Sequence, residues 1–206
     1  EGHVFGGIFK TSERHVFALF DTNDPNVRLS PAGPFAALEG TATNAVRFLD
    51  AEIPEEMILA SDAKAFLGKV KAGFILLQLG IGLGLMEGAI NDMRIANKRL
   101  LHTNLYLPEG PDVFADQLAE LKQRTMDLSI DPIASAEDND QFLKVLRLRL
   151  DAAEITRKTT YSSFLHQGSS GYLERGSGQR RVREGMFFDI LSPSVKHLYQ
   201  WIDSIN

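Results

Sequence analysis

The chain has 206 residues, 44% of them hydrophobic and 24% charged, which is typical of a folded globular protein and too apolar for a disordered one. Its net charge of −5 argues against a general nucleic-acid-binding surface, so we expect no nucleic-acid partner. There is no cysteine, which excludes disulfides and thiolate metal sites and fits a reducing, cytoplasmic location.

The first part of the chain, residues 1–60, has the pattern of β-structure. Runs of β-branched and aromatic residues predict three strands, over residues 4–9, 15–20 and 44–53. A stretch rich in Pro, Asn and Gly separates the second strand from the third. Three strands make a sheet too small to be stable alone. We therefore expect residues 1–60 to be the C-terminal part of a larger β-domain that begins before Glu1.

Helical periodicity begins at Ser61 and predicts a helix as far as Arg99. Its apolar run, Ala72 to Met86, is 15 residues long. A bilayer needs about 20, so we interpret this segment as a buried helix and expect no membrane insertion. Three glycines share one face of this helix: Gly80, Gly84 and Gly88. Each costs about 1 kcal/mol of helix stability, so we expect another backbone to approach them closely.

The remaining sequence predicts three further helices. The second begins at Pro111, the third covers about 140–166 and the last follows Ser192-Pro193. A polar loop over 129–139 and a Gly/Ser/Arg-rich stretch over 168–183 interrupt the pattern. We thus predict an α+β, mainly α, fold, with a partial antiparallel β-domain over residues 1–60 followed by an antiparallel four-helix bundle over 61–206.

Several strings, in this order, resemble the acyl-CoA dehydrogenase family. Residues 40–59 (GTATNAVRFLDAEIPEEMIL) resemble the end of that family's β-domain, where a strand crosses into the first bundle helix. Residues 83–92 (LGLMEGAIND) resemble the small-residue segment of that helix, and residues 169–198 resemble its glycine loop, arginine-rich turn and catalytic approach. The resemblance implies an oxidoreductase that holds FAD between the β-domain and the bundles of two subunits, within a dimer or tetramer.

The resemblance places Ser192 where the family usually has its catalytic glutamate. That carboxylate removes the α-proton of an acyl thioester, a task for which a serine hydroxyl is too weak a base. Some members carry the glutamate on the first bundle helix instead, but the matching position here is Phe74 or Ile75. The catalytic residue is thus unknown. The reading of Ser192 that needs no catalysis is a helix cap followed by Pro193.

For the cofactor, the resemblance implies a contact from Arg99, or alternatively Lys98, near the end of the first bundle helix. It also implies contacts from Gln167 and Gly168 in a glycine-containing loop of the partner subunit. For the arginines at positions 175, 180, 181 and 183, a surface turn and a phosphate contact are equally plausible. The five histidines lack metal-ligand spacing, so we expect no metal site.

These expectations leave three functions open. The first is the C-terminal portion of an FAD-dependent, acyl-CoA dehydrogenase-like oxidoreductase acting on an acyl-CoA-type substrate. The second is a non-catalytic homologue or partner subunit that contributes its bundle to dimerisation or to another subunit's FAD site. The third is a flavin-dependent monooxygenase of the same fold, because such relatives also lack the glutamate.

Overall fold

The computed structural model describes residues 2–205, and the chain divides into two compact units on either side of the Val70–Lys71 bond. Helix makes up 64% of the chain and strand 13%, so the predicted α+β, mainly α, fold is confirmed. The division falls inside the first long helix, α1 (Ala63–Asn104), later in the chain than the boundary expected at residue 60.

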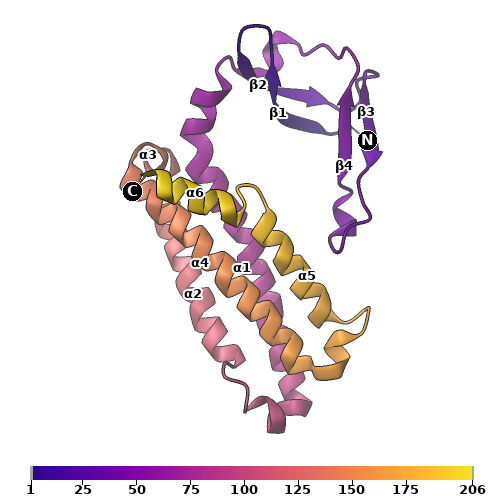
Figure 1. The fold of residues 1–206 in the computed structure, drawn as a ribbon, viewed down its shortest axis with the longest axis vertical. Helices are drawn as coiled ribbons and strands as arrows, with labels where there is room; N and C mark the ends of the chain where they lie inside the picture. The colour runs from indigo at the N-terminus through magenta and orange to yellow at the C-terminus, as the bar shows by residue number, and fades with distance from the viewer. Residues whose placement is uncertain (1, 206) are drawn as a thin grey trace. The chain divides into compact units, whose positions relative to one another are not determined.

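The first unit contains two small antiparallel sheets (Figure 1). One has the strand order β1-β2-β5, and the other pairs β3 with β4. The strands are β1 (Val4–Lys10), β2 (His15–Asp21), β3 (Val27–Pro31), β4 (Asn44–Phe48) and β5 (Ile58–Ala60). The first two predicted strands are confirmed, whereas the third ends at Phe48 rather than at residue 53. Strands β3 and β5 were not predicted, because five and three residues are too short to give a clear alternating pattern.

Four phenylalanines form the aromatic core of this unit and join its two sheets. The Phe48 ring, on β4, meets Phe20 of β2 and Phe9 of β1 edge-on, with ring centroids 4.7 Å and 5.3 Å away. Phe5 stacks on Phe20. Phe5 and Phe48 remain 42% and 38% exposed, so this core is thin. That residues 1–60 belong to a larger β-domain stays a prediction.

The second unit is the helical bundle, in which α1, α2, α4 and α5 run alternately in opposite directions (Figure 1). Its fully buried side chains include Ile75, Leu79 and Met86 from α1, Phe114 from α2, and Leu146 from α4. The elements after α1 are α2 (Pro111–Leu128), α3 (Pro132–Glu137), α4 (Asn139–Gln167), the 3-10 helix η3 (Gly168–Tyr172), α5 (Ser177–Ile190) and α6 (Val195–Ile205).

Helix α5 supplies the fourth bundle helix and corrects the prediction. The sequence placed a stretch without helical pattern over residues 168–183 and assigned the fourth position to the helix after Pro193, which is the short α6. Arginines and glycines hide the apolar period of α5. Gly185 is buried, and a Cβ there would lie 2.9 Å from Oγ1 of Thr160. This glycine therefore lets α5 pack closely against α4.

The glycines of α1 also differ from expectation. A Cβ at Gly80 or Gly84 would meet no atom within 4 Å, so no described element of this chain approaches them. The close approach occurs at Gly82, where a Cβ would lie 2.4 Å from the Phe188 ring of α5. At Gly88 the nearby group is the Arg181 guanidinium. The predicted face was therefore wrong, although close packing against α1 does occur.

Helix α1 is long and apolar enough to cross a membrane by length and composition alone. An 18-residue window of it has a mean hydropathy of 1.7, and 44% of that window is buried within this chain. Long core helices of bundles share these properties, and α1 contributes Ile75, Leu79 and Met93 to the bundle core. The absence of membrane insertion stays a prediction.

Candidate functional site

A pocket of about 490 Å³ lies where α1 and α4 end. Its lining includes all three residues for which the sequence predicted cofactor contacts: Arg99, Gln167 and Gly168. Residues of the last turns of α1 and α4 and of the start of η3 complete the wall. The structure thus brings together side chains that are 68 positions apart in the sequence (99 and 167).

Arg99 is the cation of this pocket. It is exposed, and within residues 2–205 it forms no ion pair or side-chain hydrogen bond. Across the pocket, Gly168 has φ 57° and follows directly on α4. This positive φ suits glycine, which has no Cβ, and the chain leaves α4 here at the pocket wall.

Gln167 contributes to the wall rather than offering a free amide. Its Nε2 donates to Oγ of Ser163 over 3.2 Å, and its Oε1 accepts from Oγ of Ser177 over 3.0 Å. Both ends of the amide are therefore engaged within the chain, and they join α4 to the start of α5.

Sequence reasoning missed His166 as part of this pocket. Its side chain is only 1% exposed, and its Nδ1 lies 2.8 Å from the carbonyl oxygen of Ser162. Because a carbonyl only accepts, Nδ1 carries the proton in this pair. The backbone oxygen of His166 accepts from Nδ2 of Asn104 over 3.0 Å, which links the ends of α1 and α4. A lone histidine at the end of a helical pattern gives no signal of such a role.

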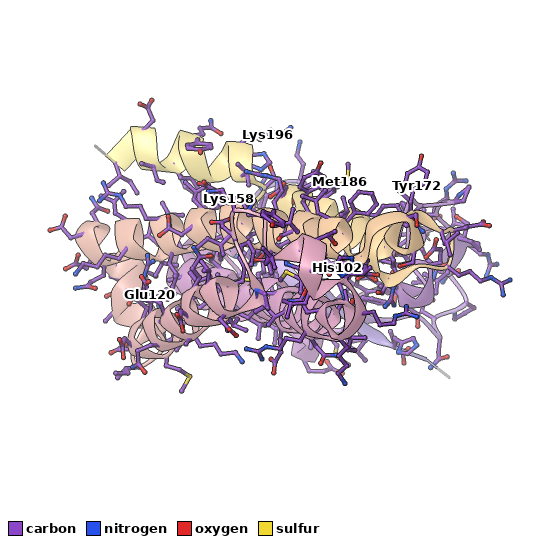
Figure 2. All side chains as sticks on the ribbon, turned by 90° about the horizontal axis from the view of Figure 1, so that it is seen from below. His102, Glu120, Lys158, Tyr172, Met186 and Lys196 are labelled. Atoms are coloured by element: carbon purple, nitrogen blue, oxygen red, sulfur yellow. The ribbon has the colours of Figure 1, made fainter. Side chains whose placement is uncertain are left out.

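The arginine-rich segment divides between interior and surface. Arg181 forms an ion pair with Asp92 of α1, with Nε and Oδ2 2.5 Å apart and both side chains less than a fifth exposed. Arg180 lies 3.9 Å from Glu184 on its own helix, and Arg175 is exposed. Tyr172, before these arginines, and Met186, after them, are exposed and point away from the bundle (Figure 2). Arg181 is therefore committed to holding α5 against α1.

The second candidate region is the α5–α6 loop, residues 191–194, which carries Ser192. The Ser192 side chain is exposed, while its carbonyl oxygen accepts from Nε2 of Gln78 on α1 over 2.5 Å. The interpretation of Ser192 as a helix cap was wrong. Ser194 precedes α6, its carbonyl accepts from the amides of His197 and Leu198, and its Oγ lies 2.9 Å from Nδ1 of His197.

No free carboxylate stands at either base position implied by the resemblance. Phe74 is 55% exposed and Ile75 is buried, and neither can accept a proton. Asp189, three residues before Ser192, is ion-paired with Arg157, with Oδ2 and Nη1 2.9 Å apart. The loop therefore exposes the Ser192 hydroxyl, while the Ser192 carbonyl is held by Gln78.

A fully buried arginine, Arg149 of α4, lies against the end of α5. Its Nη2 donates to the carbonyl oxygen of Phe188 over 2.6 Å, and its guanidinium carbon lies 3.7 Å from the centroid of the Phe188 ring. Burial lowers the pKa of Arg149 to about 10, and the negative charge of Asp189 partly opposes this shift. The sequence analysis did not single out Arg149.

We compared the chain with known proteins by sequence and by structure. No family model matches the chain, and no curated protein matches it. Solved structures do match over nearly its whole length. Dibenzothiophene monooxygenase (TdsC) from Paenibacillus sp. A11-2 aligns with a TM-score of 0.77 at 13% identity, covering 97% of this chain and 58% of that one. KijD3, in complex with FMN and dTDP-3-amino-2,3,6-trideoxy-4-keto-3-methyl-D-glucose, aligns with a TM-score of 0.76 at 14% identity, covering 98% and 54%.

Butyryl-CoA dehydrogenase from Megasphaera elsdenii also matches, with a TM-score of 0.66 at 15% identity, covering 98% of this chain and 55% of that one. The chain has the acyl-CoA dehydrogenase-like fold. It spans slightly more than half the length of these acyl-CoA dehydrogenase-like structures. At 13–15% identity the likeness concerns the fold and leaves the activity open.

Proposed function

We propose that the chain is part of a flavin-dependent oxidoreductase with the acyl-CoA dehydrogenase-like fold. The observation that carries the proposal is the pocket that unites Arg99, Gln167 and Gly168 at the ends of α1 and α4. Solved structures of the same fold include complexes with FMN and an acyl-CoA dehydrogenase, which supports flavin as the cofactor class.

The pocket residues fit the phosphate-bearing end of a flavin nucleotide. Arg99 is exposed and unpaired within residues 2–205, and a guanidinium is well suited to phosphate oxygens. A volume of about 490 Å³ lies in the range of small-molecule sites. We propose FAD, because a dinucleotide carries the adenosine and pyrophosphate that such a pocket would take. A bound flavin would supply two-electron redox chemistry, which no side chain of this chain can.

Calorimetric titration of the chain with FAD, FMN and ADP tests the pocket. Since the chain spans slightly more than half of its structural neighbours, we expect FAD to bind with a Kd above about 1 μM. Arg99→Ala should weaken FAD and ADP binding about tenfold, or about 1.4 kcal/mol, while FMN binding changes less. Lys98→Ala is the matched control, since Lys98 is an exposed neighbouring cation that does not line the pocket. Equal losses in the two variants, or no binding at all, would remove the basis of the proposal.

The α5–α6 loop bears on which reaction the flavin supports. Removing an α-proton from an acyl thioester requires a base, and the loop offers only the Ser192 hydroxyl. Oxygenation by reduced flavin does not need a carboxylate there. A monooxygenase, TdsC, is among the solved structures that share the fold. We therefore favour a flavin-dependent monooxygenase over a dehydrogenase of an acyl-CoA-type substrate.

Two spectroscopic mixtures separate these reactions and the non-catalytic alternative. Acyl-CoA added to the flavin-loaded protein without oxygen should bleach the flavin absorbance only if the protein is a dehydrogenase. Chemically reduced flavin mixed with oxygen and protein should give a transient spectrum that differs from that of free flavin if the protein is a monooxygenase. Bound flavin that responds to neither mixture would favour the non-catalytic homologue or partner subunit.

A further inference from the structure

Arg149 is a charged residue in the middle of the bundle core. Its side chain is completely buried, and among residues 2–205 it forms no ion pair. Of its donors, Nη2 serves the Phe188 carbonyl, whereas Nε and Nη1 are buried without a partner. Moving such a cation out of water is strongly unfavourable, and an apolar side chain would fill the same space without that cost. Packing therefore does not account for an arginine here.

The group that Arg149 holds is the end of α5. The Phe188 carbonyl belongs to the last turn, where carbonyls lack intrahelical partners and carry partial negative charge. A buried guanidinium supplies both the missing hydrogen bond and a positive charge. The Phe188 ring lies between the Arg149 guanidinium and Gly82 of α1. The ring comes so close to Gly82 that a side chain at position 82 would clash with it.

Neighbouring contacts extend this hold to the loop. Asp189 is paired with Arg157 of α4, and four residues after Phe188 the Ser192 carbonyl accepts from Gln78 of α1. Neither of these contacts involves the Ser192 side chain. The hydroxyl at position 192 is therefore left exposed on a segment that is fixed from two helices.

We propose that Arg149 is a positioning residue that fixes the end of α5, and with Gln78 sets the place of the position-192 side chain. The relevance to catalysis rests on the proposed function, in which position 192 corresponds to the base position of acyl-CoA dehydrogenase-like enzymes. The hold itself needs no flavin, so it can be measured independently.

The chain lacks cysteine, so two introduced cysteines can carry spin labels for distance measurement by pulsed electron resonance. Ser192→Cys paired with Ser129→Cys, an exposed site after α2, reports on the loop. Ser170→Cys paired with Ser129→Cys reports on the exposed η3 segment as the control. Each labelled pair is measured in four backgrounds: the otherwise wild-type chain, Arg149→Lys, Arg149→Met and Gln78→Leu.

Arg149→Met keeps the bulk and removes the donors, so it should broaden the 129–192 distance distribution about twofold and leave the 129–170 distribution unchanged. Arg149→Lys, which keeps the charge and a donor, should restore most of the narrow distribution. Gln78→Leu should broaden only the 129–192 distribution, and it provides the test if Arg149→Met does not fold.

Equal broadening of both distributions would show that Arg149 only supports the bundle as a whole. An unchanged 129–192 distribution in both Arg149→Met and Gln78→Leu would overturn the proposal outright. A broadened loop together with a failed flavin titration would reject the proposed function alone, because the distance measurement contains no flavin.

Discussion

The two candidate regions of the bundle are built by opposite means. In the pocket at the ends of α1 and α4, the Arg99 side chain is exposed and forms no ion pair or side-chain hydrogen bond within residues 2–205. The α5–α6 loop, toward the other end of the bundle (Figure 1), is held from beneath by buried polar side chains, Arg149 and Gln78. The pocket therefore keeps the positive charge of Arg99 available for a ligand. At the loop, the polar side chains of Arg149 and Gln78 instead donate to backbone carbonyls. Mutations should accordingly change binding at the first region and stability or loop position at the second.

The largest effect should come from filling the space beside Phe188. In Gly82→Leu the new side chain would have to occupy the volume of the Phe188 ring, because a Cβ alone would lie 2.4 Å from it. We expect a loss of about 3 kcal/mol in the free energy of unfolding, measured in urea. Gly84→Leu is the control. A Cβ there would meet no atom of residues 2–205 within 4 Å beyond its own helix, so stability should stay within about 1 kcal/mol of the wild type or rise, as the better helix propensity predicts.

Sedimentation of the same two variants adds a further reading. If Gly84→Leu destabilised the protein and changed its mass in solution, the open face of α1 would be an interface between copies of the chain. The predicted dimer or tetramer would then be supported. Equal stability losses in the two variants, with no change of mass in solution, would contradict the packing described for Phe188.

The next prediction compares two ion pairs that α1 forms with other helices, one largely buried and one exposed. Asp92→Asn removes the partner of Arg181 in a pair whose side chains are 17% and 14% exposed. Because the guanidinium stays largely buried, we expect a loss of about 2–3 kcal/mol in the free energy of unfolding. Asp112→Asn breaks the pair with Arg94, where the side chains are 90% and 55% exposed, and should cost less than about 0.5 kcal/mol. A double variant with Arg181→Met should recover part of the loss, and failure to recover would show that Asp92 acts through another group.

The smallest effect concerns the loop's two serines. Ser194→Ala removes the hydroxyl that lies 2.9 Å from His197 at the start of α6, and should cost about 1 kcal/mol of stability. Ser192→Ala should change stability by less than about 0.5 kcal/mol, because only its backbone carbonyl is engaged. The thermal unfolding midpoints of the two variants, measured side by side, show which serine contributes more to stability. The reverse order of losses would restore Ser192 as the helix cap.

Much of the fold could be predicted from the sequence because its signals are local. Strands β1 and β2 and the helices α1, α2 and α4 follow from alternation, from 3.6-residue periodicity and from Pro111 at a helix start. Helix α5 could not be found this way. Its glycines are required by close neighbours such as Thr160, and only the three-dimensional structure shows those neighbours.

The candidate site divides in the same manner. The resemblance implied cofactor contacts from Arg99, Gln167 and Gly168 but placed the glycine loop on the partner subunit, so their convergence in one chain was not predicted. No local pattern joins residues so far apart. Arg149 lies in a helix of alternating charged and apolar residues, where an arginine normally faces solvent. Its burial depends on Phe188 and α5, so no sequence window around Arg149 contains the cause.

The anchoring of Ser192 through its carbonyl also bears on how this loop can change over time. Every amino acid has that carbonyl, so a replacement at position 192 leaves the hydrogen bond from Gln78 available. Serine, glutamate or another residue could alternate there while the loop keeps its course. The side chain presented at that point is thereby uncoupled from the integrity of the fold, and it can change without compensating changes in the bundle.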